Sequence, residues 1–148
     1  MAASVMLARR IKDAVIPATT GTMSLHPSGT SGDSITLTSS ATDGALGAAF
    51  HEVVAVDTIT SEYRITSVVV HGFVRAGRHD IYVYTGLASA EVLQGSFTVA
   101  AGATADGFVV PVSMSNFPAN TRVIMKVAHQ DADGGTKACT VAINYVTV

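Results

Sequence analysis

The stretch Tyr63–Thr85, YRITSVVVHGFVRAGRHDIYVYT, decides the fold class because it carries the densest β-branched and aromatic run in the chain. Such residues suit a pleated, half-buried surface, so the stretch predicts two long strands. We expect a tight turn at residues 76–78 between them, with Phe73 facing Ile81 across the ladder. The two strands would then form a β-hairpin.

In this register both faces of the hairpin are apolar. One face holds Val69, Phe73, Ile81 and Val83, and the other holds Val68, Val70, Val74, Tyr82 and Tyr84. Strands that are apolar on both faces are typical of a sheet that is covered on both sides. The hairpin is therefore expected in the middle of a sheet.

Shorter strand patterns, separated by turn residues, flank the hairpin. They cover 35–39, 50–58, 91–99, 108–112, 121–130 and 137–148. Leu93, Phe97 and Val99 are expected to point inward, and Pro111 marks an edge strand because it has no N–H to donate. Together the patterns predict an all-β, eight-stranded antiparallel β-sandwich. A jelly-roll arrangement is favoured over an immunoglobulin-like one, because the chain has no Cys-Trp-Cys framework.

Residues 1–33 are expected to form an N-terminal arm, and residues 34–148 the sandwich domain. Ala2–Ile16 has an imperfect apolar helical stripe that ends before Pro17, and the Gly/Ser/Thr-rich segment that follows predicts flexible or extended chain. The charges of this stretch follow its apolar residues, which is the reverse of a secretory signal. The stripe either docks on a neighbouring subunit, caps its own sandwich, or is a frayed end. The partner-binding candidates are Val5, Leu7, Arg9, Arg10, Ile11 and Val15.

The composition favours a protein whose surface is largely covered by partners. Of 148 residues, 48% are hydrophobic but only 14% are charged, against roughly 25% in average domains. So few charges would do little to keep a free monomer apart from its neighbours. A net charge of -2 and scattered basic residues argue against nucleic acid as a partner. No run of about 18 apolar residues is present, so no membrane span is expected.

No group of residues in the sequence has the spacing of a metal site. Asp131–Gly135 resembles the start of a calcium loop, but Ala142 stands where the bidentate carboxylate should be, so a hairpin turn is favoured. His71, His79, Asp80 and His129 are candidate zinc ligands, but the hairpin register places His71 and His79 too far apart to share an ion, so polar or half-buried histidines are expected. We therefore expect no metal or cofactor.

Motifs of catalysis are also missing. Cys139 is the only cysteine, has no evident base in sequence and is expected to be a small buried hydrophobe. The chain has no Gly-x-Ser-x-Gly elbow and no phosphate-binding glycine loop. We expect no enzyme activity. Tyr82 and Tyr84 share a face and could stack on a sugar, although packing in the core is favoured for them.

A polar arm before a compact, low-charge sandwich rich in Ala, Val, Thr and Gly resembles the small jelly-roll structural proteins of viral particles. The likeness is greatest to the head decoration (cement) proteins of tailed bacteriophages. It covers the whole chain but has no specific motif, so it transfers no functional residue. It implies a non-enzymatic virion protein, made in the host cytoplasm, that forms trimers or other symmetric oligomers and binds a major capsid protein. One alternative is a carbohydrate- or receptor-binding module of a tail fibre or secreted protein. Another is an enzyme on a jelly-roll scaffold, which would need a cluster of histidines and carboxylates inside a barrel.

Overall fold

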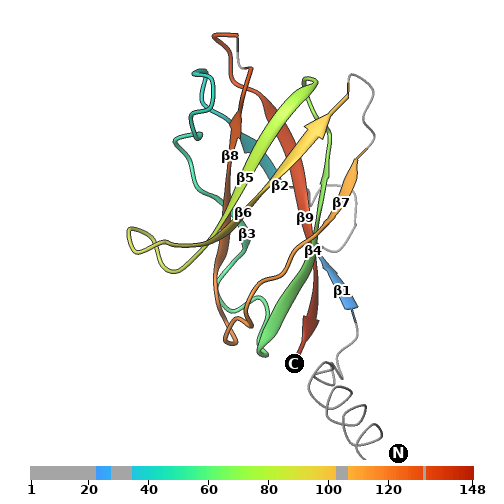
Figure 1. Cartoon of the computed structure of the whole chain (residues 1–148). Coiled ribbons are helices and arrows are strands. Elements are labelled where there is room, and N and C mark those ends of the chain that lie inside the picture. The colour runs from blue at the N-terminus through green and yellow to red at the C-terminus, as the bar shows by residue number, and fades with distance from the viewer. Residues whose placement is uncertain (1–22, 28–34, 103–106, 132) are drawn as a thin grey trace, which may run out of the picture.

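The computed structural model describes residues 23–27, 35–102, 107–131 and 133–148, and these residues form an all-β fold (Figure 1). They contain strands and turns but no helix, and so no helix that could cross a membrane. The strands are β1 (Met23–His26), β2 (Ile35–Thr38), β3 (His51–Val54), β4 (Tyr63–His71), β5 (Gly77–Thr85), β6 (Val92–Ala101), β7 (Phe108–Pro111), β8 (Val123–His129) and β9 (Ala138–Thr147). The prediction of an all-β sandwich is confirmed.

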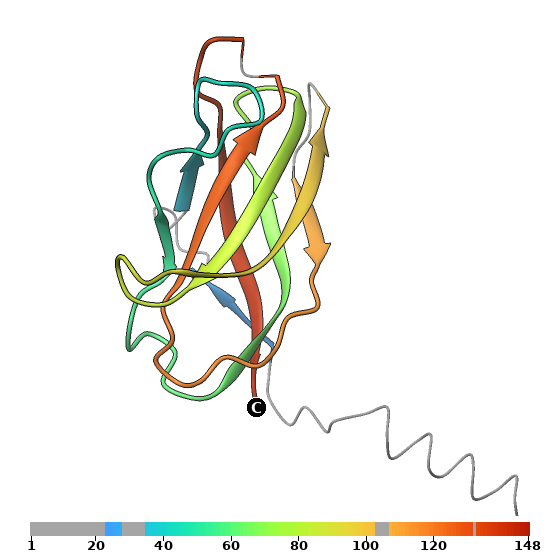
Figure 2. The same ribbon diagram turned by 60° about the vertical axis from the view of Figure 1, so that its left-hand side comes forward.

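The strands form two antiparallel sheets that lie in two layers (Figure 2). In the five-stranded sheet, β7, β4 and β9 are neighbours in that order, and β1 and β2 both pair with the free edge of β9. The four-stranded sheet has the order β3-β8-β5-β6. β7, which contains Pro111, is an edge strand, as its missing N–H predicted.

The predicted hairpin of Tyr63–Thr85 is wrong, although its two strands are present. β4 pairs with β7 and β9, whereas β5 pairs with β6 and β8, so the two strands belong to opposite sheets. The chain crosses between the sheets through residues 72–76, which begin with Gly72 at φ 61°. Phe73 is therefore not a ladder partner of Ile81. Each strand is central in its own sheet and is covered by the other sheet on one face only.

The core lies between the two layers and explains the apolar pattern of both strands. Val68 and Val70 of β4 and Ile81 and Val83 of β5 are fully buried and face the interior from opposite sheets. These residues were assigned to opposite faces of one hairpin, whereas all four line the same core. Tyr63 closes the other end of the core, where its hydroxyl donates a 2.9 Å hydrogen bond to the carbonyl oxygen of Thr121.

Two irregularities change which side chains point inward. In the β5–β6 ladder, Val83 pairs with Gly95 but Tyr84 pairs with Leu93, so a bulge at Gln94 reverses the alternation beyond it. Leu93, which was expected inside, is 51% exposed, while Phe97 and Val99 are partly and fully buried. The strand predicted at 50–58 is also shorter than expected, because it covers only His51–Val54.

Part of the predicted arm belongs to the sandwich. Met23–His26 forms β1, which pairs with residues 143–146 of β9. The predicted helix Ala2–Ile16, with all six partner-binding candidates, lies outside the described residues.

Candidate functional site

The outer side of the five-stranded sheet forms a broad surface almost without charge. Alternation along β9 buries Cys139, Val141 and Ile143 in the core, so the residues between them point outward. The outward residues of the neighbouring strands follow from the ladder partners. We call this surface the uncharged face; it consists of Leu25, Thr36, Ser67, Val69, Val109, Pro111, Thr140, Ala142 and Asn144.

The strand register arranges this face in rows across the sheet. One row runs Ala142, Val69 and Val109 across β9, β4 and β7. The next row runs Leu25, Asn144, Ser67 and Pro111 across β1, β9, β4 and β7. Small and β-branched side chains in these rows make a flat surface that another flat surface can cover closely.

The polar groups at the centre of the uncharged face bond to one another. The side-chain amide of Asn144 donates a 2.9 Å hydrogen bond to the Ser67 hydroxyl. The Thr66 hydroxyl donates to the carbonyl oxygen of Asn144. Both hydrogen bonds would stay intact if a partner covered them. The apolar side chains around them, including Val109 at 64% exposed and Leu25 at 42%, are free to be buried.

Charge lies only at the border of this face. Arg64 lies near the start of β4, where it is the ladder partner of Val146, and His71 is the last residue of the strand. Burial of apolar surface stabilises a contact by about 25 cal/mol per Å². Because no charge at the centre of the face would have to be desolvated, this gain favours protein–protein contact. Apolar side chains around a centre of mutually bonded polar groups make this face suited to docking.

The outer side of the four-stranded sheet carries the predicted stacking residues. Tyr82 and Tyr84 point outward and are half-buried, because the alternating Ile81 and Val83 face the core. Tyr84 packs edge-on against Phe50 with ring centroids 5.3 Å apart, and the Lys126 ammonium lies 4.1 Å from the Phe50 centroid. Part of the Tyr84 ring is therefore engaged within the protein. Burial, and then Tyr82, raise the pKa of Tyr84.

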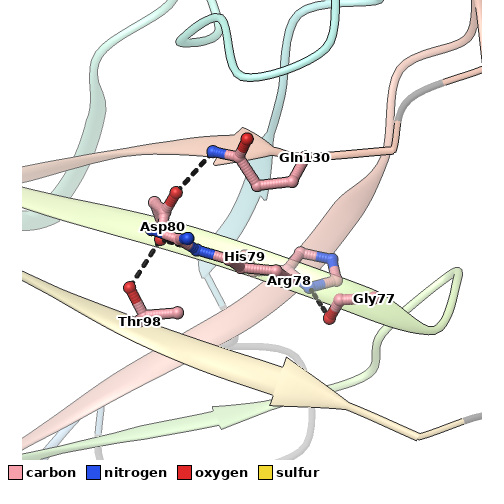
Figure 3. A network of polar contacts seen from close by, with 6 residues as sticks. All are labelled: Gly77, Arg78, His79, Asp80, Thr98 and Gln130. Carbon is pink, nitrogen blue, oxygen red and sulfur yellow. Dashed lines mark hydrogen bonds and ion pairs between the residues drawn. The ribbon is translucent and has the colours of Figure 1, made fainter.

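A polar network lies on the same sheet, nearer the crossover from β4 to β5 (Figure 3). Asp80 accepts hydrogen bonds from Thr98 at 2.5 Å, Gln130 at 2.6 Å and Arg78 at 2.9 Å. Burial alone would raise the pKa of Asp80, but these hydrogen bonds and the Arg78 charge outweigh it and hold the pKa below its ordinary value. The network joins β5, β6 and the end of β8 and is structural in character.

Two buried histidines lie on the core side of the same strands. His79 and His129 are ladder partners, both fully buried, with ring centroids 4.4 Å apart. The sequence did not predict this contact, because the two histidines are 50 positions apart and nothing in the sequence shows that β5 and β8 are neighbours. The prediction that the histidines are polar or half-buried is wrong for this pair. His71, in the other sheet, is half-buried and is not part of the contact.

The histidine pair does not have the donor set of a metal site. His129 Nδ1 accepts a hydrogen bond from the Asp131 N–H, so in the neutral ring the proton resides on Nε2, which then cannot ligate. Among the described residues no group of three or more His, Cys, Asp or Glu side chains is placed to hold a metal ion. At the calcium-like turn, Arg75 pairs with Asp133 and lies 3.9 Å from Asp131.

Cys139 is fully buried in β9, and burial raises the pKa of its thiol to about 12. A thiol that stays protonated at neutral pH is a poor nucleophile, which agrees with a packing role.

In comparisons with known proteins, no protein-family model and no curated protein matches this chain. The function is therefore argued from the surfaces described above.

Proposed function

We propose that this protein is a non-enzymatic structural subunit of a virus particle, a capsid decoration protein that associates with itself and with a particle protein through the uncharged face. The observation that carries the proposal is the Asn144–Ser67 hydrogen bond at the centre of that face. It satisfies the central polar side chains inside the sheet and leaves Val69, Val109 and Ala142 to bury against a partner.

The strand order supports the jelly-roll part of this proposal. From β2 onward, the strand orders of the two sheets are β2-β9-β4-β7 and β3-β8-β5-β6. This is the order expected of a jelly roll built from two Greek keys. Jelly rolls of this kind are common in viral capsid proteins and in lectins. Because one fold serves several functions, the strand order favours a virion role without carrying it alone.

The proposed partners follow from the same face. A trimer of this chain, bound to a major capsid protein in the virion, would cover the uncharged face and the edge strand β7. The apolar stripe of Val5, Leu7, Ile11 and Val15, with Arg9 and Arg10 beside it, would add a second attachment to the neighbouring subunit.

The test is the molar mass of matched variants, measured by size-exclusion chromatography with light scattering at micromolar concentration. Val109→Glu places a charge on the uncharged face, and Leu87→Glu places the same charge at a site of similar exposure, 67% against 64%, outside it. The wild type and Leu87→Glu are expected to be oligomers, and Val109→Glu a monomer of 15.2 kDa. A wild-type monomer that also fails to bind intact phage heads would contradict the proposal.

A second candidate function is sugar or receptor binding at Phe50, Tyr82 and Tyr84. The observation that favours it is the presence of three aromatic rings on one outer surface of the four-stranded sheet. A glycan array probed with the wild type and with Tyr82→Ala would test it. Binding that Tyr82→Ala removes and Val109→Glu leaves intact would favour this function over assembly.

A further inference from the structure

His79 and His129 are locked in different neutral tautomers by the backbone. His79 Nδ1 lies 3.2 Å from the Gly77 carbonyl oxygen, which can only accept, so this nitrogen carries a proton. His129 Nδ1 lies 3.0 Å from the Asp131 nitrogen, whose N–H it accepts, so this nitrogen carries none. The neutral pair thus has one Nε2 with a lone pair, on His79, and one Nε2–H, on His129.

Neither Nε2 atom has a hydrogen-bond partner among the described residues. The aromatic ring of Phe73 and the backbone of Gly77 lie against the pair. The Phe73 ring lies with its centroid 4.9 Å from that of His79, and a Cβ on Gly77 would stand 2.9 Å from His129 Nε2. No acceptor is in place for a second proton on either ring.

A proton would bind to a different nitrogen in each ring, but in both cases it would leave a buried charge without a partner. A proton on His129 must go to Nδ1, where it would face the Asp131 N–H and break that hydrogen bond. A proton on His79 must go to Nε2, inside the core and against the His129 ring. Either event places an uncompensated charge in an apolar site, which is costly.

The pair holds together three segments at one end of the sandwich. The His129 carbonyl oxygen accepts from the Gly44 N–H, and its ring holds Asp131 at the start of the turn before β9. Phe73, which packs on His79, belongs to the crossover between the sheets, and the next residue, Val74, donates its N–H to the Ala138 carbonyl. Separation of the two rings would loosen all three.

We propose that the His79–His129 pair is an acid-operated latch, which closes this end of the sandwich while both rings are neutral and opens it when either ring takes up a proton. The latch is independent of the proposed virion role, because it rests only on contacts within one chain.

Other charged groups surround the pair and do not reverse this outcome. On the elements packed around it, the described titratable or charged side chains are Asp43, His71, Arg75, Arg78, Asp80, Asp131, Asp133 and Lys137. Burial and the neighbouring His129 lower the pKa of His79, and the Gly77 carbonyl and Asp80, which favour the charged ring, are outweighed.

The sign of the pH effect follows from this shift. A histidine whose pKa is lower in the folded state binds protons more readily when unfolded, so it destabilises the fold as pH falls below its ordinary value of about 6.5. Each such histidine can raise the unfolding equilibrium constant by up to about tenfold per pH unit below that value. His51 contributes to the same trend, because burial and Lys126 lower its pKa as well.

The experiment is urea unfolding of the full chain at pH 7 and at pH 5. The double variant His79→Asn/His129→Asn places an amide N–H and a carbonyl oxygen where the two Nδ1 atoms act, but it cannot titrate. The wild-type unfolding constant is expected to rise between these pH values by at least about tenfold more than that of the double variant. The control His51→Asn should keep the larger part of the wild-type rise. Equal pH dependence in the wild type and the double variant would overturn the latch.

If the double variant does not fold, nitrogen-15 NMR of the wild-type imidazoles decides the matter. The latch predicts opposite tautomers for His79 and His129 at pH 7, and an uncharged His79 ring in the folded state at pH 6. It also predicts that, near pH 5, amide exchange at Gly44 and Asp131 becomes faster relative to Phe117 at the opposite end. A normal titration of His79 near pH 6.5, with these amides unchanged, would contradict it.

Discussion

Asn144 of β9 and Ser67 of β4 share a 2.9 Å hydrogen bond at the centre of the uncharged face. The bond lies between Leu25 on one side and Pro111 on the other, in a row that contains no charge. The sheet thus satisfies its own polar side chains where a partner would remove water. This relationship makes the face apolar in effect, even though it is rich in Ser, Thr and Asn.

Replacement of Asn144 by Asp should weaken self-association without unfolding the chain. The Ser67 hydroxyl can turn to donate to the new carboxylate, so we expect a melting temperature close to that of the wild type. Association should fall by at least about tenfold, because an unpaired charge covered by a partner costs more than the roughly 1.4 kcal/mol that a factor of ten represents. Sedimentation velocity over a concentration series checks this, and an unchanged association constant would count against the face.

Gly47 is expected to tolerate no side chain. A Cβ at this position would lie 1.9 Å from the Thr38 carbonyl oxygen, while the Gly47 N–H is bonded to Val127. Gly47→Ala should therefore cost about 3 kcal/mol, at the upper end of overpacking, and lower the melting temperature by roughly 6–12 °C. Gly102→Ala, with nothing within 4 Å of its Cβ, is the matched control and should melt like the wild type. Equal melting of the two variants would show that the loop moves aside.

The Asp80 network should contribute to stability and to its pH dependence. Asp80→Asn leaves donors from Arg78, Thr98 and Gln130 facing an amide, which we expect to cost about 1–3 kcal/mol at pH 7. Because the pKa of Asp80 is held low in the fold, its contribution is present above the ordinary value of about 3.9 and is lost as pH falls through the folded value.

Urea unfolding at pH 7 and at pH 3 measures both effects. The wild type should lose more stability than Asp80→Asn between the two pH values. Parallel losses would mean that the carboxylate gains nothing from its three partners.

Truncation of the N-terminus should distinguish attachment from folding. Removal of residues 1–22 spares β1, and we expect a folded protein with weaker association, since the stripe of Val5, Leu7, Ile11 and Val15 is lost. Removal of residues 1–33 also deletes Met23–His26, which pairs with β9. This longer truncation should lower the free energy of unfolding by a further amount of about 1–3 kcal/mol. Circular dichroism melts and light scattering on both truncations check this. If loss of residues 1–22 left association unchanged, the arm would have no docking role.

The sequence predicted local structure better than it predicted neighbours. Each strand predicted between Ile35 and Val148 is present, because alternation and turn residues act over a few positions. The hairpin at Tyr63–Thr85 failed because alternation does not reveal that β4 and β5 pair with different strands. Leu93 was placed inside because nothing in the sequence marks the bulge at Gln94.

For the candidate sites too, the sequence predicted local features but not which residues are neighbours in space. The low charge content predicts that partners cover some of the surface, and this stays a prediction; only the register brings Val69, Ala142 and Val109 into one row. The contact between His79 and His129 depends on the β5–β8 ladder, which joins residues 50 positions apart. The alternating patterns of β5 and β8 are both present in the sequence, but only the fold shows that these two strands pair.

Carbene footprinting with mass spectrometry, at nanomolar and at micromolar protein, shows which side chains association covers. We expect labelling of Leu25, Val69 and Val109 to fall as concentration rises, while labelling of Phe50 and Leu87 stays constant. Protection confined to Phe50 and the four-stranded sheet, or no protection in an oligomer that light scattering detects, would contradict the assignment of the uncharged face as the site of assembly.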